Sequence, residues 1–75
     1  MKLGKVTGRV NMRKPAEELG GAQILTVEME GSSIAALDKA GAQPGDRVLV
    51  VMSQAAGMYS MEMPADAVVV AVVEN

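Results

Sequence analysis

Residues 67–73 read AVVVAVV and residues 47–52 read RVLVVM, two short runs made almost entirely of apolar, mostly β-branched side chains. Runs of this length and composition, bounded by turn residues, predict strands. In an antiparallel sheet one face usually meets the core and the other meets water, so apolar and polar residues alternate. Neither run alternates. We therefore expect both faces of these strands to be covered, one by the core and one by a second surface.

The first strand is predicted from period-two alternation over residues 5–12. The apolar parity, expected on the inner face, consists of Val6, Gly8, Val10 and Met12. Leu3 is out of phase with this set, and we expect a bulge or bend at Gly4. The stretch GKVTGRV has glycines and a lysine, as a phosphate-binding loop does. Its spacing does not fit G-x-x-x-x-G-K-[ST] and no helix is expected after it, so it is interpreted as a strand.

The remaining elements complete an all-β chain. Residues 22–29 and 34–38 predict the second and third strands, joined by the tight connection EGSS. A short helical turn is expected between Pro15 and Gly20, and a type II turn at Pro44-Gly45. Residues 53–66 are expected to be irregular, with one helical turn near residues 54–57. Five short strands and at most one short helical turn in the whole chain predict a small five-stranded antiparallel barrel, one domain over residues 1–75.

Oligomerisation is the expected means of stabilising so short a chain. Domains near 75 residues bury little apolar surface and usually need disulfides, a metal or a partner. The sequence has no Cys and no His, which excludes disulfides and removes the commonest metal ligand and general base. An exposed valine-rich wall would also be prone to aggregation. We therefore expect another copy of the chain to cover the outer faces of the last two strands.

Composition argues against several classes of function. The net charge is −2 and Tyr59 is the single aromatic residue, whereas nucleic-acid surfaces are basic and stack bases on aromatic rings. No run approaches the roughly 20 apolar residues of a membrane span, and the N-terminus lacks the apolar core of a signal peptide. We expect a cytoplasmic protein that binds neither nucleic acid nor membranes.

Candidate catalytic and metal-binding residues have simpler structural interpretations. Asp38, Asp46 and Asp66 resemble a carboxylate set, but turn and capping roles fit them better, since no His, Cys or Lys pairs with them. Ser53 lacks both the G-x-S-x-G context and a His, which disfavours a nucleophile. Three methionines in one loop suit adaptable packing at an interface better than copper binding; they are Met58, Met61 and Met63. No catalytic residue, metal or cofactor is expected.

Four segments in a fixed order resemble the EutN/CcmL family of bacterial microcompartment vertex proteins. They are MKLGKVTGRV with its basic loop and LGGAQILTVE, the D-x-x-G-A-x-x-G-D-x-V-L-V-V segment over 38–51, S-x-A-A over 53–56, and the P-x-D-A-x-[IV]-V strand from Pro64. The chain departs from the family's usual pattern in its short EGSS connection, in Met12 and Gly57, and in the loop MYSMEM. The resemblance covers essentially the whole chain.

The resemblance implies an OB-like barrel that forms cyclic pentamers, which cap the five-fold vertices of a polyhedral shell in the bacterial cytoplasm. Hexameric shell proteins would form the facets, and no active site would be present. It places Ser53, Gln54, Ala55 and Ala56 near the five-fold axis, and Arg13 and Lys14 at the rim. The alternatives are an OB-fold module that binds a nucleic acid or an oligosaccharide, and a small enzyme or metalloprotein.

Overall fold

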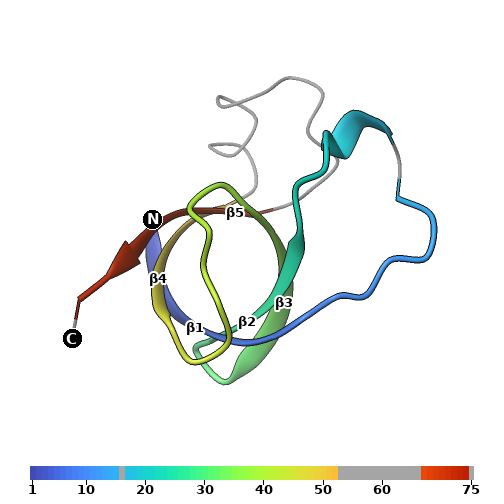
Figure 1. The fold of residues 1–75 in the computed structure, drawn as a ribbon. Helices are drawn as coiled ribbons and strands as arrows, with labels where there is room; N and C mark the ends of the chain where they lie inside the picture. Colours follow the sequence, from blue (N-terminus) through green and yellow to red (C-terminus); the bar gives the residue numbers. More distant parts are fainter. Residues whose placement is uncertain (16, 53–66, 75) are drawn as a thin grey trace.

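Five strands close into one barrel in the computed structural model, which describes residues 1–15, 17–52 and 67–74 (Figure 1). The elements in chain order are β1 (Lys2–Arg9), the 3-10 turn η1 (Glu17–Leu19), β2 (Ile24–Met29), β3 (Ser32–Asp38), β4 (Arg47–Met52) and β5 (Ala67–Val73). Around the barrel the strands run β1-β2-β3-β5-β4 and back to β1. The predicted five-stranded barrel is confirmed, but the β3–β5 pairing is parallel, so the sheet is mixed rather than wholly antiparallel.

The barrel core is built almost entirely from aliphatic side chains of alternate strand positions. β4 shows the alternation most simply: Val48 and Val50 are fully buried in the core, whereas Leu49 between them is half-buried on the outer wall. The largest fully buried side chains are Leu25, Val6, Val27, Val48, Val50, Val68 and Val69. Burial of each such side chain contributes roughly 1.5–3 kcal/mol, so the valine-rich strands supply most of the stabilising apolar area.

The first strand lies three residues earlier than the alternation predicts, and its bulge lies elsewhere. β1 ends at Arg9, and Val10 and Met12 follow it, so their predicted inward placement within a strand is wrong. The bulge lies between Val6 and Gly8 rather than at Gly4. One reason is visible at the extra residue, Thr7, whose hydroxyl donates a hydrogen bond to the carbonyl of Thr26 across the ladder (3.2 Å).

Gly4 serves a different purpose from the predicted bulge: it allows two strands to approach. It lies in regular register with Val48 of β4. A Cβ atom built on it would lie 2.6 Å from Cγ1 of Val27, 2.7 Å from Cγ of Met29 and 3.2 Å from the carbonyl oxygen of Glu28. These distances are shorter than van der Waals contact, so a side chain at this position would push β2 away from β1.

We predict that Gly4→Ala destabilises the fold by about 1–3 kcal/mol, the usual cost of overpacking a core. Gly8→Ala is the matched control, because nothing lies within 4 Å of a Cβ at Gly8 and the two glycines share one strand. Urea unfolding followed by far-UV circular dichroism, at fixed protein concentration, measures both variants. Equal midpoints for the two variants would contradict this assignment.

The turns follow the predicted glycine chemistry. The β2–β3 hairpin pairs Met29 with Ser32, so its loop is the two residues Glu30 (φ 52°) and Gly31 (φ 82°), as in a type I′ turn. This turn is so short that β3 begins at Ser32, two residues before the predicted start. At the next connection, Gly45 has φ 97° and the amide of Asp46 donates to the carbonyl of Gln43 (3.0 Å), which confirms the predicted type II turn.

Candidate interaction surface

The outer wall of β1, β4 and β5 carries a row of apolar side chains that we call the outer strip: Leu3, Leu49 and Ala71. The register joins them directly, since Leu3 is paired with Leu49 and Leu49 with Ala71. Leu3 is 53% exposed, and Leu49 and Ala71 are half-buried. Met1, just before the strip, is 81% exposed. These positions face away from the core, so a single copy of the chain leaves them in contact with water.

A second apolar area on the outer wall is already covered. Val51 and Val68 are paired across β4 and β5 on the outer parity, yet they are 3% and 0% exposed and pack with Val70 in a cluster separate from the barrel core. The prediction that another copy covers the outer faces of β4 and β5 is therefore too broad. Part of that wall is buried within one chain, and the outer strip is the part left open.

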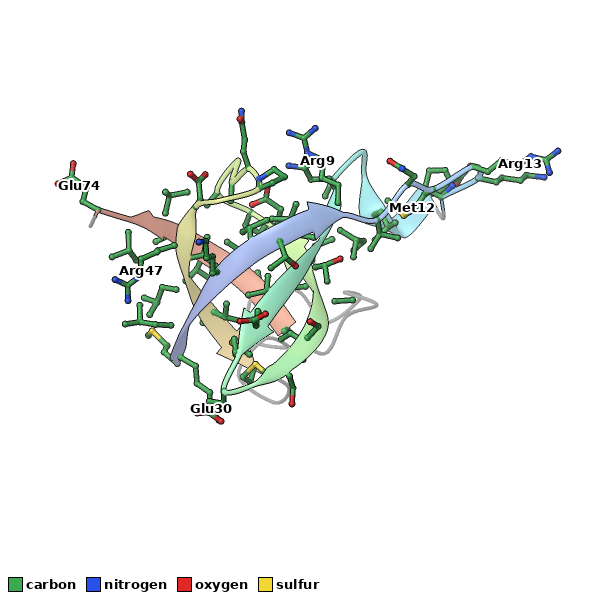
Figure 2. The ribbon with its side chains drawn as sticks, turned by 90° about the horizontal axis from the view of Figure 1, so that it is seen from below. Arg9, Met12, Arg13, Glu30, Arg47 and Glu74 are labelled. Atoms are coloured by element: carbon green, nitrogen blue, oxygen red, sulfur yellow. The ribbon has the colours of Figure 1, made fainter. Side chains whose placement is uncertain are left out.

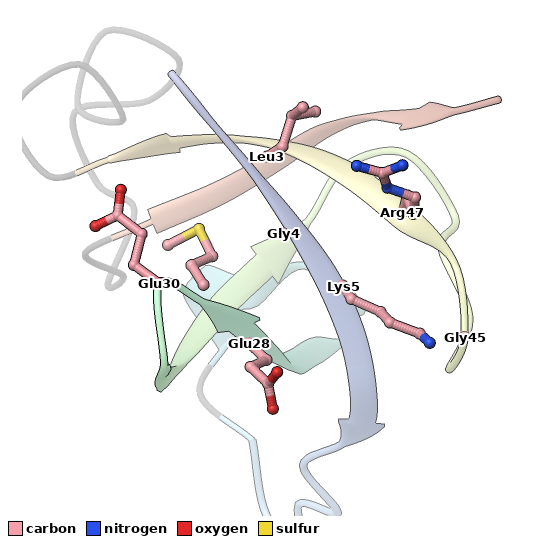
Figure 3. A pocket seen from close by; sticks show the side chains of 8 residues that line it. Leu3, Gly4, Lys5, Glu28, Glu30, Gly45 and Arg47 are labelled. Carbon is pink, nitrogen blue, oxygen red and sulfur yellow. The ribbon is translucent and has the colours of Figure 1, made fainter. Parts of the chain in front are cut away.

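A shallow groove of about 290 Å³ lies beside the outer strip, along β1 (Figure 3). Its lining residues are Leu3, Gly4, Lys5, Glu28, Met29, Glu30, Gly45 and Arg47. Lys5 is paired with Glu28 on one side and with Arg47 on the other, so one carboxylate and two cations lie across the three strands. The ammonium of Lys2 lies 3.2 Å from Glu30, an exposed ion pair. Mixed charges on an open wall suit contact with another protein surface better than enclosure of a small substrate.

Asp38 is the one buried charged residue among those described, and its contacts are structural. One carboxylate oxygen accepts hydrogen bonds from the amides of Ala40 (2.9 Å) and Gly41 (3.0 Å). The other accepts from the amide of Ala42 (3.0 Å) and from the side-chain amide of Gln23 (2.8 Å). The carboxylate of Asp38 thus accepts hydrogen bonds from three successive backbone amides of the turn after β3. This is the predicted turn role.

The pKa of Asp38 reflects this set of donors. Burial raises the pKa, but the hydrogen bonds from Gln23 and from the amides of Ala40, Ala42 and Gly41 lower it by more, so the pKa lies below its ordinary value of 3.8. A carboxyl group with a lowered pKa in the folded state stabilises the fold above its unfolded-state pKa. That contribution is lost as the pH falls through the folded-state pKa.

We predict that Asp38→Asn destabilises the fold by about 1–3 kcal/mol at pH 7, because the new amide must set a donor against N–H groups. The difference from wild type should shrink as the pH falls below about 4. Asp46→Asn is the control, since Asp46 accepts a single exposed hydrogen bond, from the amide of Gln43 (2.8 Å). Urea unfolding at pH 7 and pH 3 measures both; a difference that stays constant with pH would contradict the charged role.

The predicted site residues fall in two groups. Ser53, Gln54, Ala55 and Ala56 lie outside the described residues, as do Asp66, Tyr59 and the three clustered methionines. Arg13 and Lys14 are exposed in the loop after β1. Figure 2 shows Arg13 on the opposite side of the molecule from Arg47. The assignment of Arg13 and Lys14 to the rim stays a prediction. Among the described residues, no group of three His, Cys, Asp or Glu side chains could hold a metal ion. Within the same residues, no helix reaches the length and apolarity of a membrane span.

The family profile described as "Ethanolamine utilisation protein EutN/carboxysome" matches residues 1–74. The chain belongs to this family. A comparison with curated protein sequences gave no match. The predicted resemblance to EutN and CcmL proteins is thereby confirmed over nearly the full length.

Solved structures of this EutN/CcmL family have the same barrel. The pentameric microcompartment shell protein GrpN from Rhodospirillum rubrum is 32% identical, with a TM-score of 0.81, and the match covers 100% of this chain and 95% of that one. The pentameric shell protein from the RMM microcompartment is 28% identical, with a TM-score of 0.86 and coverage of 100% and 92%. EutN from Escherichia coli is 30% identical, with a TM-score of 0.81 and coverage of 97% and 85%.

Sequence reasoning identified the apolar outer wall but not its boundaries. It marked Leu3 only as out of phase, although this phase is what places Leu3 on the outside of β1 beside Leu49. The pairing of β1 with β4 could not be read from either strand alone. The one indication that β1 contributes to the outer strip was that Leu3 lies on the opposite face of the strand from Val6.

Proposed function

We propose that this EutN/CcmL-family protein is a structural component of a bacterial microcompartment shell. Five copies of the 75-residue domain form a ring that caps a five-fold vertex, and hexameric shell proteins surround it in the bacterial cytoplasm. The chain acts by assembly and not by catalysis. The observation that carries this proposal is the family match over residues 1–74, joined to solved relatives that are themselves pentameric shell proteins.

The outer strip supports assembly independently of the relatives. Leu3, Leu49 and Ala71 form an apolar row across three strands, in which Leu3 is 53% exposed and the other two are half-buried. Fully burying an exposed leucine is favourable by roughly 1.5–3 kcal/mol, so covering the open parts of Leu3 and Leu49 contributes a fraction of that for each. Another copy of the same chain is the partner we propose, because it is present wherever the protein is made.

The loop that the family resemblance places near the five-fold axis remains part of the proposal. Ser53, Gln54, Ala55 and Ala56 would line the centre of the ring. In a cyclic assembly each side chain is repeated around the axis, and none of these four residues would bring a charge there.

We predict that native mass spectrometry of the purified protein gives five times the monomer mass of 7.8 kDa. Leu49→Glu should dissociate this species, raising the concentration needed for assembly more than tenfold, because it sets a charge in the middle of the outer strip. A stable wild-type monomer at micromolar concentration would falsify the proposal.

Ala35→Glu is the matched control for Leu49→Glu. Ala35 is exposed on β3, paired with Thr26, and lies outside the outer strip. It introduces the same side chain on the same kind of strand surface, so the five-fold mass should persist. Far-UV circular dichroism of both variants separates lost assembly from lost folding.

A further inference from the structure

Two exposed segments lie at opposite ends of the molecule. We call residues 10–15, which follow β1, the arm, and residues 70–74, which end the described chain, the β5 tip. Figure 1 shows the arm and the C-terminus on opposite sides of the barrel, and the view turned by 90° in Figure 2 again places Arg13 and Glu74 at opposite ends. The two segments therefore cannot contact each other within one copy.

The exposed apolar side chains single out these two ends. Among the described residues, the large apolar side chains that are exposed are Met1, Leu3, Val10 and Val72. Leu3 belongs to the outer strip, and Met1 lies just before it in the chain. The other two lie one at each end: Val10 at the base of the arm is 41% exposed, and Val72 in the β5 tip is 46% exposed.

The charges of the two ends are opposite. The arm reads VNMRKP, with two cations and no carboxylate, and both Arg13 and Lys14 are exposed. The β5 tip reads VAVVE and ends on the exposed carboxylate of Glu74, while the exposed Arg47 of β4 is paired with Val73 beside it. Each segment thus offers one exposed valine, and Glu74 is the charge in the β5 tip that complements the two cations of the arm.

The β5 tip also has a free edge. Parallel pairing with β3 involves only Val68 and Val69 of β5, and the last such bond in the described chain runs from the amide of Lys39 to the carbonyl of Val69. Beyond that point β5 continues to Val73 with β4 as its one described ladder partner. An apolar strand with a free edge is the kind of surface that proteins usually cover.

We propose that the arm of one copy lies against the β5 tip of the next copy, with Val10 on Val72 and with Arg13 and Lys14 beside Glu74. A contact between two different surfaces at opposite ends of a molecule is heterologous, and such contacts generate closed rings when the rotation permits. The inference rests on the proposed ring and adds the pairing that sets its direction. It assigns the basic pair of the arm to a neighbouring copy, where the sequence placed it only at the rim.

Because the chain contains no Cys, engineered cysteines test this contact directly. In the double variant Val10→Cys/Val72→Cys, mild oxidation should produce a ladder of covalent species up to the pentamer on non-reducing gels, since a disulfide needs Cα atoms within about 7 Å. Each single variant has one thiol and could form at most a covalent dimer, and it should not do so, because its cysteine would face a valine of the neighbouring copy. The pair Val10→Cys/Ala35→Cys is the matched control and should remain monomeric on the gel.

A charge exchange tests the same contact without a cross-link. Arg13→Glu/Lys14→Glu should weaken the ring by roughly three- to tenfold per contact, and Glu74→Lys by less. Combining all three substitutions in one chain should restore much of the lost affinity.

The outcomes separate this inference from the proposed function. A wild-type pentamer by native mass spectrometry whose Val10→Cys/Val72→Cys form gives no ladder would overturn the arm contact and leave the shell role intact; the basic pair would then be free for hexameric shell proteins. A disulfide-linked dimer from either single cysteine variant would also overturn it, because like ends would then meet. A monomeric wild-type protein would instead overturn the proposed function.

Discussion

The parallel pairing between β3 and β5 is the constraint on which the barrel depends. It joins the third strand to the last with only two residue pairs, Leu37 with Val68 and Asp38 with Val69. Without it the chain would be an open sheet of five strands with β3 and β5 as edges. Asp38 lies at this seam, and its side chain fixes the turn that follows while its backbone amide donates to the carbonyl of Gln23 (2.9 Å). Closure and turn formation are thus served by one residue.

Hydrogen bonds at the β3–β5 seam explain why the buried carboxylate of Asp38 is tolerated in an otherwise aliphatic barrel. An ionised group costs free energy when buried unless hydrogen bonds replace its water, and Asp38 accepts four from the turn and from Gln23. The same hydrogen bonds give the backbone amides of the turn an acceptor, the carboxylate of Asp38. A polar residue that satisfies several backbone donors at once holds the start of the β3–β4 connection where apolar packing alone gives little direction.

Because the pairing of β3 with β5 stops at Val69, it also shapes the outer surface. β5 runs on along β4 to Val73, and among the described residues β4 is the one strand paired with these last positions. The same strand therefore contributes to the core at its start and to an exposed, apolar end. Together with the outer strip on β1, β4 and β5, this gives the barrel the distinct, non-identical surfaces that a directional ring of identical copies requires.

Much of the fold could be predicted because the evidence for it is local. The turn at Pro44-Gly45, the bounds of β4 and β5 and the 3-10 turn before Gly20 follow from residue types that favour those conformations. Two predictions for the first strand were wrong: Val10 does not face the core, and the bulge lies between Val6 and Gly8 and not at Gly4. Alternation over residues 5–12 records the strand's own pattern and not where the partner strand Ile24–Met29 allows the ladder to continue.

Sequence by itself determined the all-β class and the family and led us to expect a partner, because apolar runs, turn residues and the absence of Cys and His are properties of the chain alone. Tertiary structure alone decided which apolar residues a single copy leaves open. Val51 and Leu49 are equally apolar neighbours in one strand, yet Val51 is buried within a single copy and Leu49 is left half-open beside Leu3. Val51 packs with Val68 and Val70 of β5, whereas Leu49 lies beside Leu3 and Ala71. These contacts join residues distant in sequence, so they depend on the pairing of the strands and not on the composition of β4.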